Sequence, residues 1–109
     1  MTFDVTIIGH RFLADFGPKA RYEFRFVDDT HLDVVVLEDA TYASGTVNHF
    51  DIAMTRIRTN VDMVTWIEPA TGNTVTHVED FESGVVFTNI TDLASKQFWR
   101  LAGQLRPID

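Results

Sequence analysis

The sequence predicts an all-β protein in which residues 1–109 form a single antiparallel up-and-down β-barrel of roughly eight strands. Apolar and polar residues alternate with a period of two in short segments, which is typical of strands with one buried face. Turn-forming residues separate these segments, and no segment has the length and period of a long amphipathic helix. With 45% hydrophobic residues the chain can build one core, whereas two half-size domains would need disulfides or metals, and cysteine is absent.

The expected strands follow one another along the chain. One or two strands fit before Gly17-Pro18, and the strict alternation of Tyr22 to Phe26 ends at the turn Asp28-Asp29. The remaining expected strands are Leu32 to Leu37, a single long strand Val47 to Ile57, Val61 to Glu68, Thr74 to Phe81, Val85 to Thr91 and Gln97 to Leu105.

Turn chemistry favours a meander of these strands. The segment Pro69 to Asn73 has the composition of a tight hairpin, and Glu82 to Gly84 makes a second short turn. Regular short hairpins favour an up-and-down barrel, and a barrel of eight strands can hold one small ligand. A β-sandwich of the same strands is the structural alternative.

Charge and composition exclude several classes of partner. Nine Lys and Arg against 16 Asp and Glu give a net charge of −7, which repels phosphate backbones and anionic membranes. Neither nucleic acid nor a membrane is therefore expected as a partner. Met1 to Val5 lacks the basic region of a signal peptide, and the apolar stretch Val5 to Ile8 is too short to span a membrane. We expect a cytoplasmic protein.

Four segments of the second half of the chain form a more specific pattern than alternation alone: Trp66 to Val75, His77 to Phe81, Thr88 to Thr91 and Phe98 to Leu105. This pattern resembles the family named for molybdenum-cofactor biosynthesis protein F. In that family a Trp-x-Glu strand end, a glycine turn and a Thr-Val-Thr-His-Val-Glu-Asp-Phe strand recur. The resemblance covers about residues 10 to 107 and implies a lipocalin-like (calycin) barrel.

The hairpin Trp66-x-Glu68-Pro69 also resembles the phenolic acid decarboxylases, which share the barrel. In that family the Glu of this motif points into the barrel and acts in catalysis, which implies a catalytic role for Glu68. The tyrosine pair of that family falls on Phe12 and Ala14 here, and its arginine falls near Gly45-Thr46. The substrate-holding part of that machinery is therefore missing.

The β-hairpin around Pro69 carries the candidate chemistry. If Glu68 faces inward, Trp66, Val64 and Asp62 share its face. Pairing Glu68 with Asn73 then sets Trp66 opposite Val75, Val64 opposite His77 and Asp62 opposite Glu79. Desolvation in such a cavity would raise the pKa of a carboxylate, which suits proton transfer near neutral pH.

Simpler interpretations stand beside this one. A Glu before Pro is often solvated, His77 could be a core histidine, and Glu79 could belong to a polar hairpin end. His49 and Asp51 share the i, i+2 spacing of His77 and Glu79, but that spacing is common by chance. No metal is therefore expected. No cofactor is expected either, because the sequence has no phosphate loop and no dinucleotide fingerprint.

Two functions follow from the sequence. The first is a binding protein that holds a small hydrophobic or aromatic molecule inside the barrel. The second is a cofactor-free lyase, isomerase or cyclase that uses Glu68 and His77 as acid and base. A third, structural interpretation is a homodimer whose barrels are filled by side chains. The expected ligand contacts are Trp66, Val64, Val75, Glu79, Tyr22 and His49.

Overall fold

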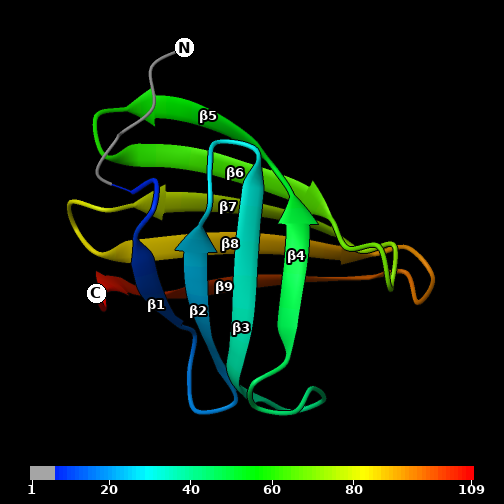
Figure 1. The fold of residues 1–109 in the computed structure, drawn as a ribbon. Helices are drawn as coiled ribbons and strands as arrows, with labels where there is room; N and C mark the ends of the chain where they lie inside the picture. The colour runs from blue at the N-terminus through cyan, green and yellow to red at the C-terminus, as the bar shows by residue number, and fades with distance from the viewer. Residues whose placement is uncertain (1–6) are drawn as a thin grey trace.

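The chain folds into one antiparallel sheet that curls into a nearly closed barrel, as the sequence predicts (Figure 1). This is a computed structural model, and it describes residues 7–109, so the N-terminal segment Met1 to Val5 considered above lies outside the described residues. No helix occurs among the described residues. The strands are β1 (Arg11–Asp15), β2 (Ala20–Phe26), β3 (His31–Asp39), β4 (Val47–Asp51), β5 (Ala53–Arg58), β6 (Val61–Ile67), β7 (Thr74–Asp80), β8 (Val85–Asp92) and β9 (Gln97–Pro107).

The strand order is β4-β3-β2-β1-β9-β8-β7-β6-β5, so every neighbouring pair except β1 and β9 is also adjacent in sequence. The β1–β9 pairing brings the first and last strands together, for example Ala14 opposite Leu105. Gly103 is needed at this junction, because a Cβ there would lie 2.5 Å from the carbonyl oxygen of Asp15. Strands β4 and β5 form the two ends of the sheet.

The expected single strand Val47 to Ile57 is wrong, because the structure divides it into β4 and β5. At the break, the Ile52 N–H donates to the Thr30 carbonyl at 2.9 Å, outside the ladder between β3 and β4. The chain then pairs with β6 instead of β3. Phe50, Ile52 and Met54 all stay buried through this change of partner, so the described residues form nine strands while the burial pattern continues unbroken.

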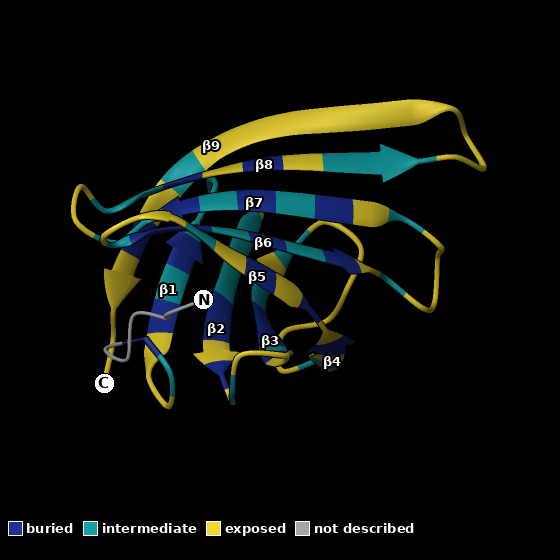
Figure 2. Cartoon of the chain, turned by 90° about the horizontal axis from the view of Figure 1, so that it is seen from above, coloured by how far each residue is buried: buried dark blue, intermediate teal, exposed yellow. Residues whose placement is uncertain are grey.

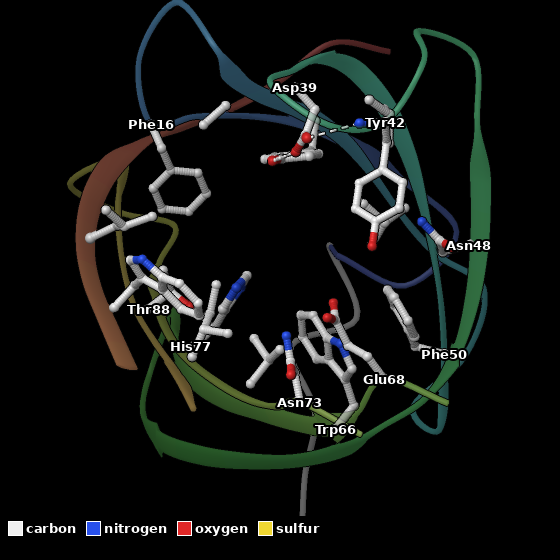
Figure 3. Close-up of a pocket in the computed structure, with 18 of the residues that line it drawn as sticks. Phe16, Asp39, Tyr42, Asn48, Phe50, Trp66, Glu68, Asn73, His77 and Thr88 are labelled. Carbon is white, nitrogen blue, oxygen red and sulfur yellow. Dashed lines mark hydrogen bonds between the residues drawn. The ribbon is translucent and has the colours of Figure 1, made fainter. Parts of the chain in front are cut away.

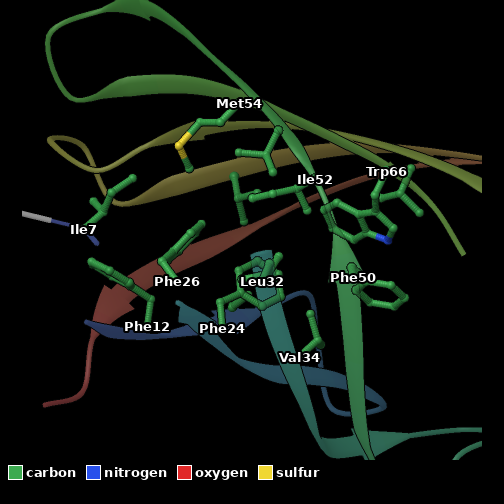
Figure 4. Close-up of a cluster of buried hydrophobic side chains, with 14 of the residues drawn as sticks. Ile7, Phe12, Phe24, Phe26, Leu32, Val34, Phe50, Ile52, Met54 and Trp66 are labelled. Carbon is green, nitrogen blue, oxygen red and sulfur yellow. The ribbon is translucent and has the colours of Figure 1, made fainter. Parts of the chain in front are cut away.

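One end of the barrel is filled by apolar side chains (Figure 4). Phe12 packs edge-on against Phe26 and Phe81, with ring centroids 5.9 and 4.9 Å apart. Leu32 and Ile7 are fully buried in the same cluster. This packing closes the end of the barrel at which β1 begins and leaves the other end free to form a cavity.

The first half of β9 is exposed along its length (Figure 2). Residues 97–103 pair only with β8, whereas β1 pairs with residues 104–107. Trp99 and Leu101 line the barrel interior yet keep 41% and 40% of their surface exposed. Solvent therefore reaches the interior beside these two residues. Among the described residues no helix is long and apolar enough to cross a membrane.

Candidate ligand-binding site

A cavity of about 330 Å³ occupies the end of the barrel away from the Phe12 cluster (Figure 3). This volume is near the lower limit of ligand pockets, which span about 300–1,000 Å³. It suits a molecule of one or two rings. Aromatic side chains dominate its wall: Phe16, Tyr22, Phe24, Tyr42, Phe50, Trp66 and Trp99.

The β6–β7 hairpin has the register that the sequence predicts. Trp66 pairs with Val75, Val64 with His77 and Asp62 with Glu79, and the Glu68 N–H donates to the Asn73 carbonyl at 2.8 Å. The turn closes through Gly72, whose φ of 75° lies in the left-handed region that glycine adopts without strain. Four predicted site residues of this hairpin line the cavity: Trp66, Glu68, Val75 and His77.

Two other predicted residues of the hairpin lie deeper. Val64 and Glu79 are fully buried and belong to the packed interior, not to the cavity wall. The structure therefore does not place these two side chains where a ligand in the cavity would contact them. Glu79 instead contacts His77, as described below.

His77 is held between aromatic rings. Phe24 stacks on the imidazole with centroids 5.4 Å apart, and Trp66 meets it edge-on at 4.8 Å. Phe50 in turn stacks on Trp66 at 5.2 Å. These rings fix the imidazole plane and make the cavity floor apolar around one polar group.

The second constraint on His77 is a carboxylate. Its Nδ1 lies 3.0 Å from Oε2 of Glu79, and both side chains are buried. An ionised Glu79 accepts a hydrogen bond from Nδ1–H, which leaves Nε2 as the ring nitrogen available to the cavity. The pair therefore sets both the tautomer and the direction of the imidazole.

Glu68 supplies a carboxylate to the same cavity from just beyond β6. It is half-buried, and desolvation raises the pKa of its carboxyl. The Trp66 indole, the Thr71 hydroxyl and His77 offset only part of this effect, while the negative charge of Asp39 adds to it. The direction agrees with the expectation for a carboxylate facing a cavity, and Figure 3 shows Glu68 beside Trp66.

A second carboxylate, Asp39, was not expected from the sequence. It is the last residue of β3 and lies at the cavity rim, where it accepts a hydrogen bond from the Tyr22 hydroxyl. The backbone N–H groups of Thr41 and Tyr42 donate to its other oxygen at 2.7 and 3.1 Å. Burial acts to raise the pKa of Asp39, but these hydrogen bonds outweigh burial and lower it.

Tyr22 lines the cavity, as expected, and its pKa shifts in the opposite direction to that of Asp39. Burial first, and then the hydrogen bond and negative charge of Asp39, raise the pKa of its hydroxyl. At neutral pH the rim therefore holds an anionic Asp39 and a neutral Tyr22. The only sequence signal for this arrangement is Asp39 two and three residues before Thr41 and Tyr42, the spacing of an Asx turn.

His49 is a third predicted contact that does not line the cavity. Alternation along β4 turns Asn48 and Phe50 inward, so His49 faces outward, where its Nδ1 lies 2.6 Å from Asp33. Asp51 is also on the outside, whereas His77 and Glu79 are buried. No group of three or more potential metal-ligating side chains gathers anywhere in residues 7–109.

Together the nearly closed meander and its aromatic cavity define a lipocalin-like barrel with space for a small ligand. The model of the MoaF-like family matches residues 8–106, and the chain belongs to this family. No curated protein matches the chain.

Among solved structures, a Burkholderia vietnamiensis protein described as a "putative beta-lactamase" is similar over 94% of this chain and 95% of its own. The TM-score is 0.81 and the sequence identity is 23%, so the likeness shows the fold alone. The resemblance to phenolic acid decarboxylases stays a prediction. Phe12 and Ala14, which stand at the tyrosine positions of that family, are buried in the packed core.

Proposed function

We propose that this protein binds one small aromatic or otherwise apolar molecule inside its barrel. The observation that carries the proposal is the cavity of about 330 Å³, with an aromatic wall and a few polar groups on it. Ligand sites are concave and mostly apolar, with few polar groups that set orientation. A barrel filled for structure alone would not keep such a space next to a packed core.

Two polar groups contact different parts of the ligand in this proposal. His77 on β7 pairs with Val64 on β6, and Glu68 lies four residues beyond Val64 along the chain. At about 3.3 Å per residue, Glu68 and the Val64–His77 pair are roughly 13 Å apart along the strand direction. Trp66 lies between them on the same face. A ring stacked near Trp66 therefore directs one substituent toward Glu68 and its other edge toward His77.

A pair of variants on β8 tests occupancy of the cavity. Ile90→Trp fills space in the cavity wall and is expected to abolish binding of small aromatic probes in isothermal titration calorimetry. Asn89→Trp is the matched control, because Asn89 directly precedes Ile90 on β8 and its side chain is exposed on the outer face. Equal binding by both variants would show that probes bind elsewhere.

The His77–Glu79 pair favours a second candidate, a cofactor-free lyase, isomerase or cyclase. An imidazole oriented by a buried carboxylate at 3.0 Å is suited to act as a general base through Nε2, and Glu68 is the second acid or base. The test is solvent exchange: bound candidate substrates in D₂O should gain deuterium with the wild type and not with His77→Gln. A bound molecule that exchanges equally slowly with both proteins would leave binding as the function.

A further inference from the structure

We propose that the ligand carries a positive charge: an amine cation attached to an aromatic or apolar body, with its ammonium group held at the Glu68 end of the cavity. This inference names the ligand class for the proposed binding site and rests on that proposal. It follows from the signs of the charges, the unpaired oxygen atoms and the aromatic rings that face the cavity.

The charged groups on the cavity wall are carboxylates. Of the described residues that line it, none is Lys or Arg, whereas Asp39 and Glu68 both are present. The titratable side chains that act on Glu68 are Asp39, Tyr22 and His77, and the first of these repels further negative charge. The protein as a whole carries a net charge of −7, which adds to the negative potential at the opening.

The polar atoms left without partners on this wall include two acceptors. Thr88 is 3% exposed, and its Oγ1 has no hydrogen-bond partner among the described residues. The Asn73 Oδ1 atom, next to Glu68 across the turn, is buried and unpaired in the same way. Buried polar atoms are normally paired, so an N–H donor of a ligand near Glu68 would complete the Asn73 atom. Thr88 pairs with His77, so its hydroxyl faces the other end of the ligand. An ammonium group has three donors and no acceptor.

The aromatic wall favours the same charge. A cation over the face of Trp or Tyr within about 6 Å is attracted by the ring quadrupole. Trp66 stands beside Glu68 (Figure 3), and the Tyr22 hydroxyl donates to Asp39, so an aromatic ring accompanies each carboxylate on the cavity wall. An ammonium next to Glu68 also favours the ionised form of that carboxyl, against the effect of burial.

Carboxylate and phosphate ligands fit this wall poorly. Such anions are bound in proteins by Arg, Lys or several convergent N–H donors. Here the backbone N–H groups of Thr41 and Tyr42 already donate to Asp39, and the Tyr22 hydroxyl does too. An anion would find those donors occupied and two carboxylates facing it.

Three probes with one ring and one chain length separate these charges: 3-phenylpropylamine, 3-phenylpropan-1-ol and 3-phenylpropanoate. Isothermal titration calorimetry at pH 7 should rank their affinities in that order. We expect the amine to bind about tenfold or more tighter than the alcohol, the usual gain for a hydrogen bond to a charged group. Binding of the carboxylate should be the weakest of the three.

Glu68→Gln should remove most of the preference for the amine while leaving the affinity of the alcohol within about twofold. Glu82→Gln is the matched control, because it deletes the same charge from an exposed turn and should leave the ranking unchanged. An alcohol or carboxylate that binds wild type as tightly as the amine would overturn the assigned charge and leave the proposed function standing. No binding by any of the three would contradict the proposed function itself.

Discussion

Two phenylalanines on β2 test whether the barrel is filled at one end and hollow at the other. Phe24 and Phe26 are both buried, and their rings meet edge-on with centroids 6.4 Å apart. Phe26 also packs on Phe12 and Phe81 in the filled end, whereas Phe24 lines the cavity and stacks on His77. The same Phe→Ala substitution therefore leaves a sealed hole at one position and enlarges an existing space at the other.

The magnitudes follow from two contributions. Losing a buried Phe side chain costs roughly 1.5–3 kcal/mol in transfer free energy. A sealed hole adds about 24 cal/mol per Å³ of cavity, which brings a buried Phe→Ala to about 3–5 kcal/mol. For Phe24 the vacated volume joins the 330 Å³ cavity that solvent reaches beside Trp99, so the second contribution is small. We expect Phe26→Ala to cost at least about 1 kcal/mol more than Phe24→Ala.

Urea unfolding followed by circular dichroism measures both free energies. In thermal unfolding the same difference corresponds to a midpoint about 4–8 °C lower for Phe26→Ala, the usual shift per kcal/mol in a domain of this size. Equal losses in the two variants, or a larger loss for Phe24→Ala, would refute the division of the barrel into a packed end and a hollow end.

Three further predictions concern the rim, the candidate ligand contact and the strand junction. The lowered pKa of folded Asp39 stabilises the protein above the unfolded pKa of Asp, and this stabilisation is lost as pH falls through the folded value. Asp39→Asn should therefore flatten the acid limb of the stability curve, measured by urea unfolding, and the exposed control Asp29→Asn should not. Amine affinity should fall as pH drops through the raised pKa of Glu68, because protonation of that carboxyl removes the partner of the cation. Calorimetric titrations of Glu68→Gln should lose the Glu68 part of that profile, and an unchanged profile would contradict the contact. Gly103→Ala should lower the free energy of unfolding by about 1–3 kcal/mol through overpacking against Asp15 and Phe16, whereas Ala102→Ser on the exposed face should be neutral.

The β6–β7 hairpin could be predicted from sequence because two independent signals agree there. The period-two pattern fixes which residues share a face, and the Pro69 to Asn73 turn fixes the register. Together they give the pairing of Trp66 with Val75 and of Val64 with His77 that the structure has.

The break between β4 and β5 could not be predicted in the same way. Apolar residues continue at every second position through Phe50, Ile52 and Met54, so the pattern does not record the change of hydrogen-bond partner at Ile52. The same limit explains His49. Alternation divides a strand into two faces, but only the closed barrel decides that Asn48 and Phe50 face inward.

Asp39 was missed for a different reason. The pairing of β2 with β3 brings it to Tyr22 at the cavity rim, and the N–H groups of the following loop turn back to it. The period-two pattern also cannot predict whether the barrel is hollow, because that depends on the summed volume of the inward-facing side chains. The rings of Phe12, Phe26 and Phe81 pack against one another and fill one end, and the cavity is what remains at the other.

The most direct test of the account is an NMR titration that follows the two indole N–H signals, assigned with Trp66→Phe. Trp66 lies in the cavity floor, whereas Trp99 stands at its opening. With the tightest-binding of the three phenylpropyl probes, the Trp66 signal should shift saturably, together with backbone signals of His77, while those of Phe26 in the packed end stay in place. Saturable shifts confined to the outer face around Phe87, with Trp66 unmoved, would contradict a ligand site inside the barrel.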